Sequence, residues 1–425
     1  MKSFNYFSIV VNSLVIFFFF FLFSCEKECI PNDFPVQPTK RVSWGWQADL
    51  SNFSNELQRN PVIYKNWIII GFATDLENKN NPSVLAFNKT NGTLEWQYTH
   101  PVYPTNMLRN VKVYSHYLIL KYQNSIVCLN ADTREIIWDK SYGPQVRSEV
   151  PIEIYGEYIY QAEEFFDDIR NYPFNNSTSL VRYHIPTGVQ EKLFGEEMVI
   201  NSGDHPILYP PVVYQDTGRE LVIFSRYYLS LNTHKPVDMF AIDTQTKELV
   251  WKDTSYSHLS DAWNTAPFIF EGDVIGSSDY TVYSWDATTG LLNWSTELTG
   301  LNQKAGFTFS GPFLHDRKIF AISNEGKMFC LDAKSGSLLW QNIMVGVNEN
   351  GPARGPCNRP IIVDDILYVN TWSDQAFILF DANTGKQLER YRDADYNGRN
   401  VLYDEETKTF FVTTDDQLRA FTVKR

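Results

Sequence analysis

The sequence predicts an all-β fold, an eight-bladed β-propeller built from four-stranded antiparallel blades. One eleven-residue pattern recurs along the chain at intervals of roughly 40 to 60 residues, which is the spacing of propeller blades. Short apolar segments separated by turns surround each copy, and 15% of the residues are aromatic. Large aromatic rings suit sheets that pack face to face. The repeat therefore indicates one long ring of small sheets rather than several separate domains.

Each copy of the pattern reads as a strand, a tight turn and a second strand. Its clearest copy runs from Cys330 to Trp340. The apolar residues before Asp332 predict a buried strand, and the Asp332 carboxylate can accept hydrogen bonds from its own turn. Gly336, four residues later, permits a left-handed backbone conformation. The chain then enters another strand, which carries the large ring of Trp340.

Seven copies align on the position of Asp332. The aligned residues are Asn88, Asn130, His184, Asp243, Asp286, Asp332 and Asp381. Glycine stands four residues later in five copies, and Arg134 and Lys247 replace it in the other two. Tryptophan stands eight residues later in five copies, whereas Lys192 and Glu389 replace it in the third and seventh. We name this repeated segment the signature turn.

An eighth unit is divided between the two ends of the sequence. Residues 401–403, 409–413 and 418–423 predict three strands, after which the chain stops. Residues 42–47 resemble the fourth strand of the other units, since Trp46-Gln47 repeats Trp96-Gln97. We expect this N-terminal strand to complete the last blade. Such pairing closes the ring and leaves no exposed sheet edge at the seam.

Alternating strand directions sort the connections onto two faces. First-to-second turns and signature turns share one face, here the turn face. Second-to-third and interblade connections share the other, here the long-loop face. The long-loop face is expected to carry insertions at residues 75–83, 162–179, 225–238, 255–265 and 344–359, and aromatic residues at Tyr103, Tyr227, Tyr228, Tyr256 and Trp263. Because loops longer than their connection requires tend to carry function, this is the candidate binding face.

The first 40 residues are expected to lie outside the propeller. Lys2 and the apolar stretch 14–23 predict a signal peptide over residues 1–24, because a membrane-spanning helix needs about 20 apolar residues. The residues before Cys25 resemble a bacterial lipoprotein cleavage box, so Cys25 is the expected lipid attachment site. Residues 25–40 then predict a flexible tether, and residues 41–425 the propeller. The sequence Glu26-Lys27-Glu28, directly after Cys25, either resembles a surface-export tag of Bacteroidetes-type lipoproteins or is a solvated linker.

Composition and motifs exclude several kinds of function. The net charge of −13 argues against nucleic acid as a partner, since neutralising phosphates requires a basic face. The sequence lacks the His-Glu-x-x-His, Gly-x-Ser-x-Gly, phosphate-loop and Cys-x-x-Cys motifs of common catalytic sites. We therefore expect no catalytic residues and no cofactor. Cys128 and Cys330 occupy the same repeat position and are expected to be packing residues, while the pairing of Cys29 with Cys357 is left open.

Two groups of residues are candidate ligand sites. Asp393, Asp395, Asn397 and Asp404 have the spacing of an oxygen shell for calcium, but flanking helices are absent and Asp404 replaces the usual Glu, so a polar turn is the favoured interpretation. No metal is expected. Arginines that stand beside asparagines before the first strand of four neighbouring blades are expected to rim the central channel. These arginines are Arg59, Arg109, Arg359 and Arg399, and they form either an anion or partner site or a set of loop-holding contacts.

The signature turn resembles the blade-docking motif of the pyrroloquinoline-quinone-like propeller repeat. Residues 241–251 and 330–340 follow its pattern Ala-x-Asp-x-x-Thr/Ser-Gly-x-x-x-Trp closely. The resemblance covers residues 41–425 and implies that one tryptophan docks each blade against its neighbour. The docking tryptophans it implies are Trp46, Trp96, Trp138, Trp251, Trp294 and Trp340.

The family has two well-known branches. One contains quinone-dependent dehydrogenases, and the other is similar to the non-catalytic propeller lipoprotein of the outer-membrane β-barrel assembly machinery. Size, blade number and the lipoprotein signal favour the second. The dehydrogenases carry adjacent cysteines and a calcium set that this sequence does not match.

The resemblance implies a monomeric, lipid-anchored scaffold in the cell envelope, at the outer membrane and facing the periplasm or the surface. It is expected to bind protein partners through the long-loop face. The alternative is a surface module that binds a small molecule or glycan. A quinone-dependent dehydrogenase ranks third.

Overall fold

A computed structural model describes most of the chain from residue 42 onward. The described residues are 42–51, 57–58, 61–73, 82–101, 108–142, 146–147, 151–165, 174–200, 205–229, 238–254, 266–278, 281–298, 311–323, 326–344, 359–371, 376–392, 400–414 and 416–424. Within these ranges, the side chains of residues 57–58, 73, 146–147, 164–165, 174–177, 196–200, 205–207, 227–229, 278, 376 and 392 are not described.

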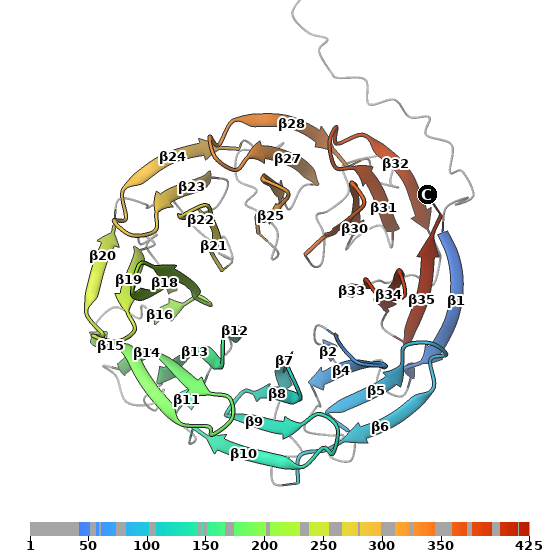
Figure 1. Cartoon of the computed structure of the whole chain (residues 1–425), viewed down its shortest axis with the longest axis horizontal. Coiled ribbons are helices and arrows are strands. Elements are labelled where there is room, and N and C mark those ends of the chain that lie inside the picture. The colour runs from blue at the N-terminus through green and yellow to red at the C-terminus, as the bar shows by residue number, and fades with distance from the viewer. Residues whose placement is uncertain are drawn as a thin grey trace, which may run out of the picture. The chain divides into compact units, whose positions relative to one another are not determined.

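Eight antiparallel sheets stand around a central axis and form the predicted eight-bladed propeller (Figure 1). The innermost strands are β3 (Val62–Tyr64), β7 (Leu108–Tyr114), β12 (Glu153–Tyr155), β17 (Val212–Asp216), β21 (Phe268–Phe270), β25 (Phe313–His315), β29 (Ile361–Val363) and β33 (Asn400–Asp404). The second strands are β4 (Trp67–Ala73), β8 (Tyr117–Tyr122), β13 (Tyr158–Phe165), β18 (Arg219–Leu229), β22 (Asp273–Ser278), β26 (Lys318–Ile322), β30 (Ile366–Asn370) and β34 (Thr409–Thr413).

The third and outermost strands complete each blade. The third strands are β5 (Val84–Asn88), β9 (Ser125–Asn130), β14 (Phe174–His184), β19 (Asp238–Asp243), β23 (Thr281–Asp286), β27 (Lys327–Asp332), β31 (Ala376–Asp381) and β35 (Gln417–Val423). The outer strands are β6 (Leu94–Tyr98), β10 (Ile136–Ser141), β15 (Gln190–Ile200), β20 (Leu249–Asp253), β24 (Leu292–Glu297), β28 (Leu338–Ile343), β32 (Gln387–Arg392) and β1 (Val42–Asp49). We number the blades 1 to 8 in the order of their innermost strands.

Blades 1, 3 and 4 have a second piece of inner strand: β2 (Leu57–Gln58), β11 (Val146–Arg147) and β16 (His205–Leu208). Each piece pairs with the far end of the second strand of its own blade. Pro61, Pro151 and Pro211 lie between the two pieces of the inner strand. Proline has no N–H to donate to the sheet, so it marks the interruption.

Two of the insertions expected on the long-loop face are shorter than the sequence indicates. β13 and β14 continue through Phe165 and from Phe174, inside the expected insertion 162–179. β18 likewise continues to Leu229, inside the expected insertion 225–238. These residues pair with neighbouring strands, as β14 does with β15 from Tyr183 to Phe174. The prediction was wrong here because cross-strand pairing, and not local composition, decides whether a polar segment is a strand.

Burial follows the position of each strand in its blade. All six side chains of β19 are buried, because the third strand has a neighbouring sheet on both faces. The outer strand β24 alternates between exposed and half-buried residues. Apolar clusters fill the spaces between adjacent blades, as where Phe320 and Cys330 of blade 6 pack with Leu367 and Phe380 of blade 7. The hydrophobic core is therefore a ring of eight interblade layers.

The N-terminal strand closes the ring, as the sequence predicts. β1 pairs with β35 in antiparallel register, from Val42 opposite Val423 to Asp49 opposite Gln417. The rings of Trp44 and Phe421 lie 5.2 Å apart across this pairing. Blade 8 is thus built from both ends of the described chain.

A buried ion pair joins blade 8 to blade 1 beside this seam. Lys89 Nζ lies 3.0 Å from Asp404 Oδ2 and 2.7 Å from Glu406 Oε2. The Lys89 and Asp404 side chains are 4% and 9% exposed, whereas Glu406 is largely in solvent. Burial alone would raise the pKa of Asp404, but hydrogen bonds from Thr407 and Lys89 hold it below its usual value. The ionised carboxylate is therefore the form that the folded chain stabilises.

We expect acid to weaken the seam. The folded pKa of Asp404 lies below its unfolded value, so its contribution is complete above about pH 4 and is lost as pH falls through the folded pKa. Lys89→Met should weaken that pH dependence, since the Thr407 bond to Asp404 remains, and should cost about 2 kcal/mol, because it leaves a shielded carboxylate without its cation. Urea unfolding at several pH values measures both effects.

The exposed ion pair between Lys65 and Asp132 is the matched control. These side chains are 61% and 42% exposed at a distance of 2.7 Å. Lys65→Met should cost well under about 1 kcal/mol, as surface pairs do. Equal losses in the two variants would show that burial at the seam has no special effect.

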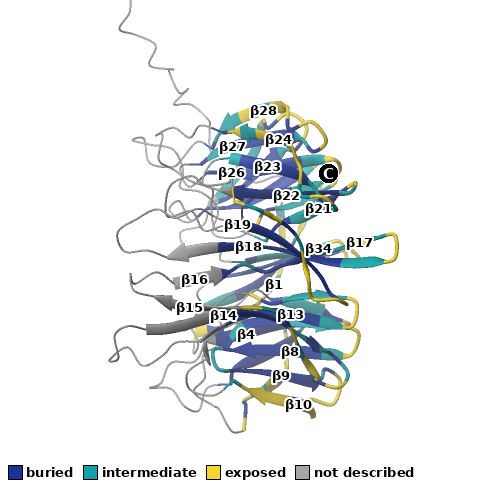
Figure 2. Cartoon of the chain, turned by 90° about the vertical axis from the view of Figure 1, so that its left-hand side faces the viewer, coloured by how far each residue is buried: buried dark blue, intermediate teal, exposed yellow. Residues whose placement is uncertain are grey.

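The described turns gather on one side of the ring in Figure 2, which is the turn face. The first-to-second turns and the signature turns lie there, as alternating strand directions require. No helix long and apolar enough to cross a membrane occurs in the part of the chain that the structure covers.

Candidate functional site

The signature turn has the same internal hydrogen bonds in most blades. In blade 6 the Asp332 carboxylate accepts from the backbone N–H groups of Lys334 and Ser335 and from the Ser335 hydroxyl, at 2.8 to 3.1 Å. The bond from the Ser335 backbone is the main reason that the pKa of Asp332 lies below its usual value. Gly336 has the expected left-handed backbone, with φ +69°. A rigid turn therefore presents a bare backbone to the preceding blade.

The signature tryptophan of one blade packs on the signature glycine of the next. A Cβ added to Gly188 would lie 2.7 Å from the Trp138 ring, and one added to Gly385 would lie 2.4 Å from the Trp340 ring. No side chain fits between ring and backbone at these positions. Trp46, Trp251 and Trp294 pack in the same way on Gly92, Gly290 and Gly336.

Four of these indoles also donate a hydrogen bond to the neighbouring blade. The acceptor is always the carbonyl of the residue after the signature Asp, Asn or His position. The pairs are Trp46 with Lys89, Trp138 with Ile185, Trp251 with Ala287 and Trp340 with Ala382, at 2.6 to 3.2 Å. Trp294 and Trp96 have no acceptor for the indole among the described residues. Trp96 meets Arg134, whose guanidinium lies 5.9 Å from the ring centroid.

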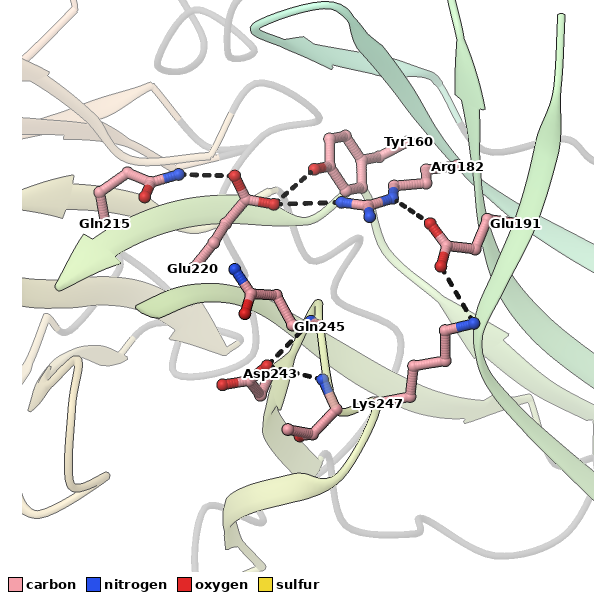
Figure 3. Close-up of polar contacts among 9 residues, drawn as sticks. Tyr160, Arg182, Glu191, Gln215, Glu220, Asp243, Gln245 and Lys247 are labelled. Carbon is pink, nitrogen blue, oxygen red and sulfur yellow. Dashed lines mark hydrogen bonds and ion pairs between the residues drawn. The ribbon is translucent and has the colours of Figure 1, made fainter. Parts of the chain in front are cut away.

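The junction between blades 3 and 4 has no tryptophan and no glycine. Lys192 and Lys247 occupy the two positions, and Lys247 has a left-handed backbone with φ +62°. Figure 3 shows that charged side chains connect the blades instead. Arg182 bonds Glu191 in its own blade at 2.7 Å and Glu220 of blade 4 at 3.1 Å, while Lys247 of blade 4 pairs with Glu191 at 3.0 Å.

Further polar groups complete this junction. The Tyr160 hydroxyl and the Gln215 amide donate to the Glu220 carboxylate (Figure 3). Burial on its own raises the pKa of Glu191, but bonds from Lys247 and Arg182 hold it lower than usual. Blades 3 and 4 are therefore joined by an ionic network, which salt screens more than it screens an indole contact.

Further polar contacts lie in blade 3 and at its border with blade 2, and they were not predicted. The Glu163 carboxylate accepts from the Tyr183 hydroxyl at 2.6 Å and from the Gln190 amide at 3.1 Å. The Tyr142 hydroxyl donates to Gln161 at 2.8 Å. Burial raises the pKa of Glu163. The available signal was Gln161, because the matching position in the second strands of blades 1, 2 and 4 is Ile70, Leu120 or Phe224.

Two of the four predicted rim arginines are described, and both belong to inner-strand segments. Arg109 is in β7, and Arg359 directly precedes Pro360 and β29. Arg359 reaches solvent, yet protein surrounds it on most sides, and its guanidinium lies 5.4 Å from the Phe313 ring. Burial lowers the pKa of Arg359, and Glu153 opposes that effect. Arg59 and Arg399 lie outside the described residues.

Glu153 connects charges from three blades. It is in the inner strand of blade 3, and it pairs with Lys112 of blade 2 at 3.1 Å. Its electrostatic effect on Arg359 reaches blade 7, which is opposite blade 3 in a ring of eight. The inner strands thus bring Lys112, Glu153 and Arg359 toward one axis.

The calcium candidate is described only at Asp404. That carboxylate pairs with Lys89 and accepts from the Thr407 hydroxyl at 2.7 Å. Asp393, Asp395 and Asn397 lie outside the described residues. Within the described ranges, no group of three or more His, Cys, Asp or Glu side chains is arranged to hold a metal ion.

Most of the remaining predicted site residues lie outside the part of the chain, or the side chains, that the structure describes. Cys25, Cys29 and Cys357 are among these, as are the long-loop aromatic side chains named above. Cys128 and Cys330 are described as free, buried thiols, and burial raises the pKa of each to about 12.

Comparison with known proteins matches part of the chain to a described family. Residues 233–424 match the family described as outer membrane protein assembly factor BamB. No curated protein sequence matches the chain. BamB from Moraxella catarrhalis has a similar solved structure, with 13% identity and a TM-score of 0.59, covering 90% of this chain and 99% of that one.

Enzymes of the same fold are equally similar in structure. The quinohemoprotein alcohol dehydrogenase ADHIIG from Pseudomonas putida HK5 has 11% identity and a TM-score of 0.61, covering 90% of this chain and 76% of that one. A europium-containing methanol dehydrogenase has the same identity and TM-score, covering 90% and 93%. At such identities the likeness concerns the fold alone. The eight sheets and the repeated docking turns show an eight-bladed propeller, and its residues 233–424 match the BamB family description.

Proposed function

We propose that the protein is a lipid-anchored, non-catalytic scaffold at the outer membrane, which binds protein partners of the cell envelope through its long-loop face. The observation that carries the proposal is the match of residues 233–424 to the BamB family description. The lipoprotein-like N-terminus, with Cys25 after a signal sequence, supports the same assignment. The protein is expected to act as a monomeric propeller.

The interblade packing supports a scaffold role. Trp–Gly docking at five junctions and an ionic network at a sixth hold the blades in one ring. Function in such a fold comes from a site placed on it and not from the fold itself. Arg359 precedes the inner strand β29 and therefore lies toward the long-loop end of the axis, where a charged partner could meet it.

Lipid attachment is tested by metabolic labelling with a fatty-acid analogue. We expect label on the wild-type chain, and none on Cys25→Ser, which should be released from the membrane fraction. Affinity purification from detergent-solubilised envelopes then tests the scaffold role, with barrel-assembly components expected to co-purify. Quinone-dependent dye reduction by the purified chain would contradict the non-catalytic assignment.

Charge reversal at Arg359 tests the location of the partner site. Arg359→Glu is expected to weaken partner capture severalfold, because like charges at an interface repel. Arg317 is the matched control, since its guanidinium lies 5.3 Å from the Phe270 ring but on a turn of the turn face. If Arg317→Glu weakens capture as much as Arg359→Glu does, the long-loop face is not the site.

A further inference from the structure

The exposed aliphatic side chains of the propeller are confined to one place. Ten large hydrophobic residues are exposed among the described residues, and all ten lie in the first three positions of an outer strand or directly before it. Five occupy one repeat position, six residues after the signature Asp or Asn position, and we name them the aliphatic rim. The rim consists of Leu94, Ile136, Leu249, Leu292 and Leu338, which are 41 to 53% exposed.

This position lies at the edge of the turn face. Each outer strand that carries a rim residue follows a signature turn, so its first residues are at the turn face and its last residues at the long-loop face. Five blades place an aliphatic residue here, and Ile137, Leu291 and Leu339 extend the exposed apolar surface beside it. Repetition at one height around the ring distinguishes this surface from scattered exposed leucines, which are normal on proteins.

The outer strands change character along their length. In β24, exposed Leu292 is followed by exposed Ser295 and Glu297 toward the long-loop end. In β10, exposed Ile136 is likewise followed by exposed Lys140. The outer wall is therefore apolar at the turn face and polar beyond it. Exposed apolar residues at the start of the outer strands, next to exposed polar residues toward their ends, are typical of a surface that lies in a membrane interface.

The tips of the signature turns do not oppose approach to a bilayer. In the four residues after each signature Asp, Asn or His, the only carboxylate among the seven described turns is Asp132. Arg134, Lys247 and Lys334 stand at the same tips, and threonine, serine and asparagine occupy many of the others. The first-to-second turns of the same face carry carboxylates, at Glu157, Glu271, Asp316, Asp364, Asp365, Glu405 and Glu406. Approach of the turn face to a bilayer therefore relies on the apolar rim and not on charge.

The start of the propeller points to the same face. Val42 begins β1 and lies opposite Val423, the last residue of the third strand of blade 8. Third strands end at the turn face, so the chain that leads back toward Cys25 leaves from there. Seventeen residues, 25–41, separate Cys25 from Val42. A flexible linker of that length has a root-mean-square span of about 23 Å.

We propose that the turn face docks on the surface of the bilayer that holds the lipid at Cys25, with the aliphatic rim at headgroup level. The long-loop face then points away from the membrane, toward partners. This rests on the proposed lipid attachment. The short tether and the rim act together, since the tether keeps the turn face within reach of the bilayer and each leucine adds apolar contact area.

Depth-dependent quenching of a fluorophore tests this orientation. The chain purified from envelopes, with Cys29→Ser and Cys357→Ser, receives one labelled cysteine by Leu292→Cys or Glu297→Cys. Cys128 and Cys330 stay unlabelled because burial suppresses thiolate formation. Both positions are on β24, so the strand itself is the matched control. The protein is reconstituted into vesicles of phosphatidylethanolamine and phosphatidylglycerol that contain headgroup-proximal nitroxide lipid.

The label at Leu292 should be quenched at least about twofold more strongly than the label at Glu297, because only the first lies at the interface. Equal quenching at both positions, with the chain still bound to vesicles, would overturn the docking while the lipid anchor stands. Failure to float with vesicles would overturn the lipid anchor and the docking together. Self-quenching between labels at Leu292 without nitroxide quenching would identify the rim as a contact between copies, which also overturns the proposal.

A rim variant tests the role of the side chains. Leu249→Ser with Leu338→Ser should bring quenching at Leu292→Cys down toward the level at Glu297→Cys, with the bound fraction unchanged. Both residues are about half-exposed, so the fold should tolerate the change. Unchanged quenching would show that the rim does not hold the orientation.

Discussion

Replacing Trp138 with alanine should lower the free energy of unfolding by about 4 kcal/mol, the typical cost of removing a large buried ring. Trp138 is 8% exposed, packs on Gly188 of the next blade and donates its indole N–H to the Ile185 carbonyl at 2.6 Å. Its ring also stacks on Tyr183, with centroids 6.2 Å apart. The change therefore opens a cavity between blades 2 and 3 and removes one interblade hydrogen bond. Urea unfolding measures the loss.

Phenylalanine substitutions separate packing from hydrogen bonding. Trp138→Phe keeps most of the ring and loses the bond to Ile185. Trp294→Phe loses no such bond, since the Trp294 indole has no acceptor among the described residues. We expect Trp138→Phe to cost about 1 kcal/mol more than Trp294→Phe. Should Trp138→Ala unfold at the wild-type midpoint, the docking account of the ring would be wrong.

Gly336→Ala should cost about 3 kcal/mol through two separate effects. The backbone at Gly336 has φ +69°, which costs a residue with a Cβ about 1 to 2 kcal/mol. The added Cβ would also lie 2.4 Å from the Trp294 ring and 2.8 Å from the Thr296 hydroxyl, so the docking contact must separate. Overpacking of this kind typically costs about 1 to 3 kcal/mol. Denaturant midpoints at constant m-value measure the sum.

Gly156→Ala isolates the backbone effect. Gly156 has φ +56° and would have no neighbour within 4 Å of an added Cβ. This variant should lose only about 1 to 2 kcal/mol. If Gly156→Ala and Gly336→Ala are equally unstable, steric contact with the tryptophan plays no part.

The repeat was predictable from sequence because its physics is local. A side chain that closes its own turn, a residue at a left-handed position and a ring at a fixed distance recur together in most blades. That spacing also predicted the closure by residues 42–47. Lys192 and Lys247 were visible as departures from the pattern, but their replacement by the network of Arg182 and Glu191 depends on residues from three strands, which no local spacing reveals.

Other features of the fold and of the candidate site could not be predicted from the sequence, because they depend on contacts between segments that are distant in the chain. Residues 174–179 are polar and resemble a loop, yet pairing with β15 makes them a strand. The leucines after the signature turns resemble core residues, because a strand pattern does not show that an outer strand has only one buried face. The rim arginines were predicted to precede the inner strands; Arg109 lies within β7 and Arg359 directly before Pro360 and β29, whereas Arg59 and Arg399 lie outside the described residues. Their role as an anion or partner site stays a prediction. The two charged residues that the structure brings toward Arg359 are Glu153 and Lys112, and both come from other blades.

Joining Ser43 to Thr422 by an engineered disulfide tests the closed ring most directly. These exposed residues face each other across β1 and β35, where paired Cβ atoms lie about 4.5 to 5.5 Å apart. Ser43→Cys with Thr422→Cys, in a chain with Cys29→Ser and Cys357→Ser, should form an intramolecular disulfide on mild oxidation, seen by mass spectrometry as one peptide joining the two ends. Ser43→Cys with Gln97→Cys, on the outer strand of blade 1, should not. A disulfide that fails to form at the first pair, or forms equally at the second, would contradict the eight-bladed ring closed by its N-terminal strand.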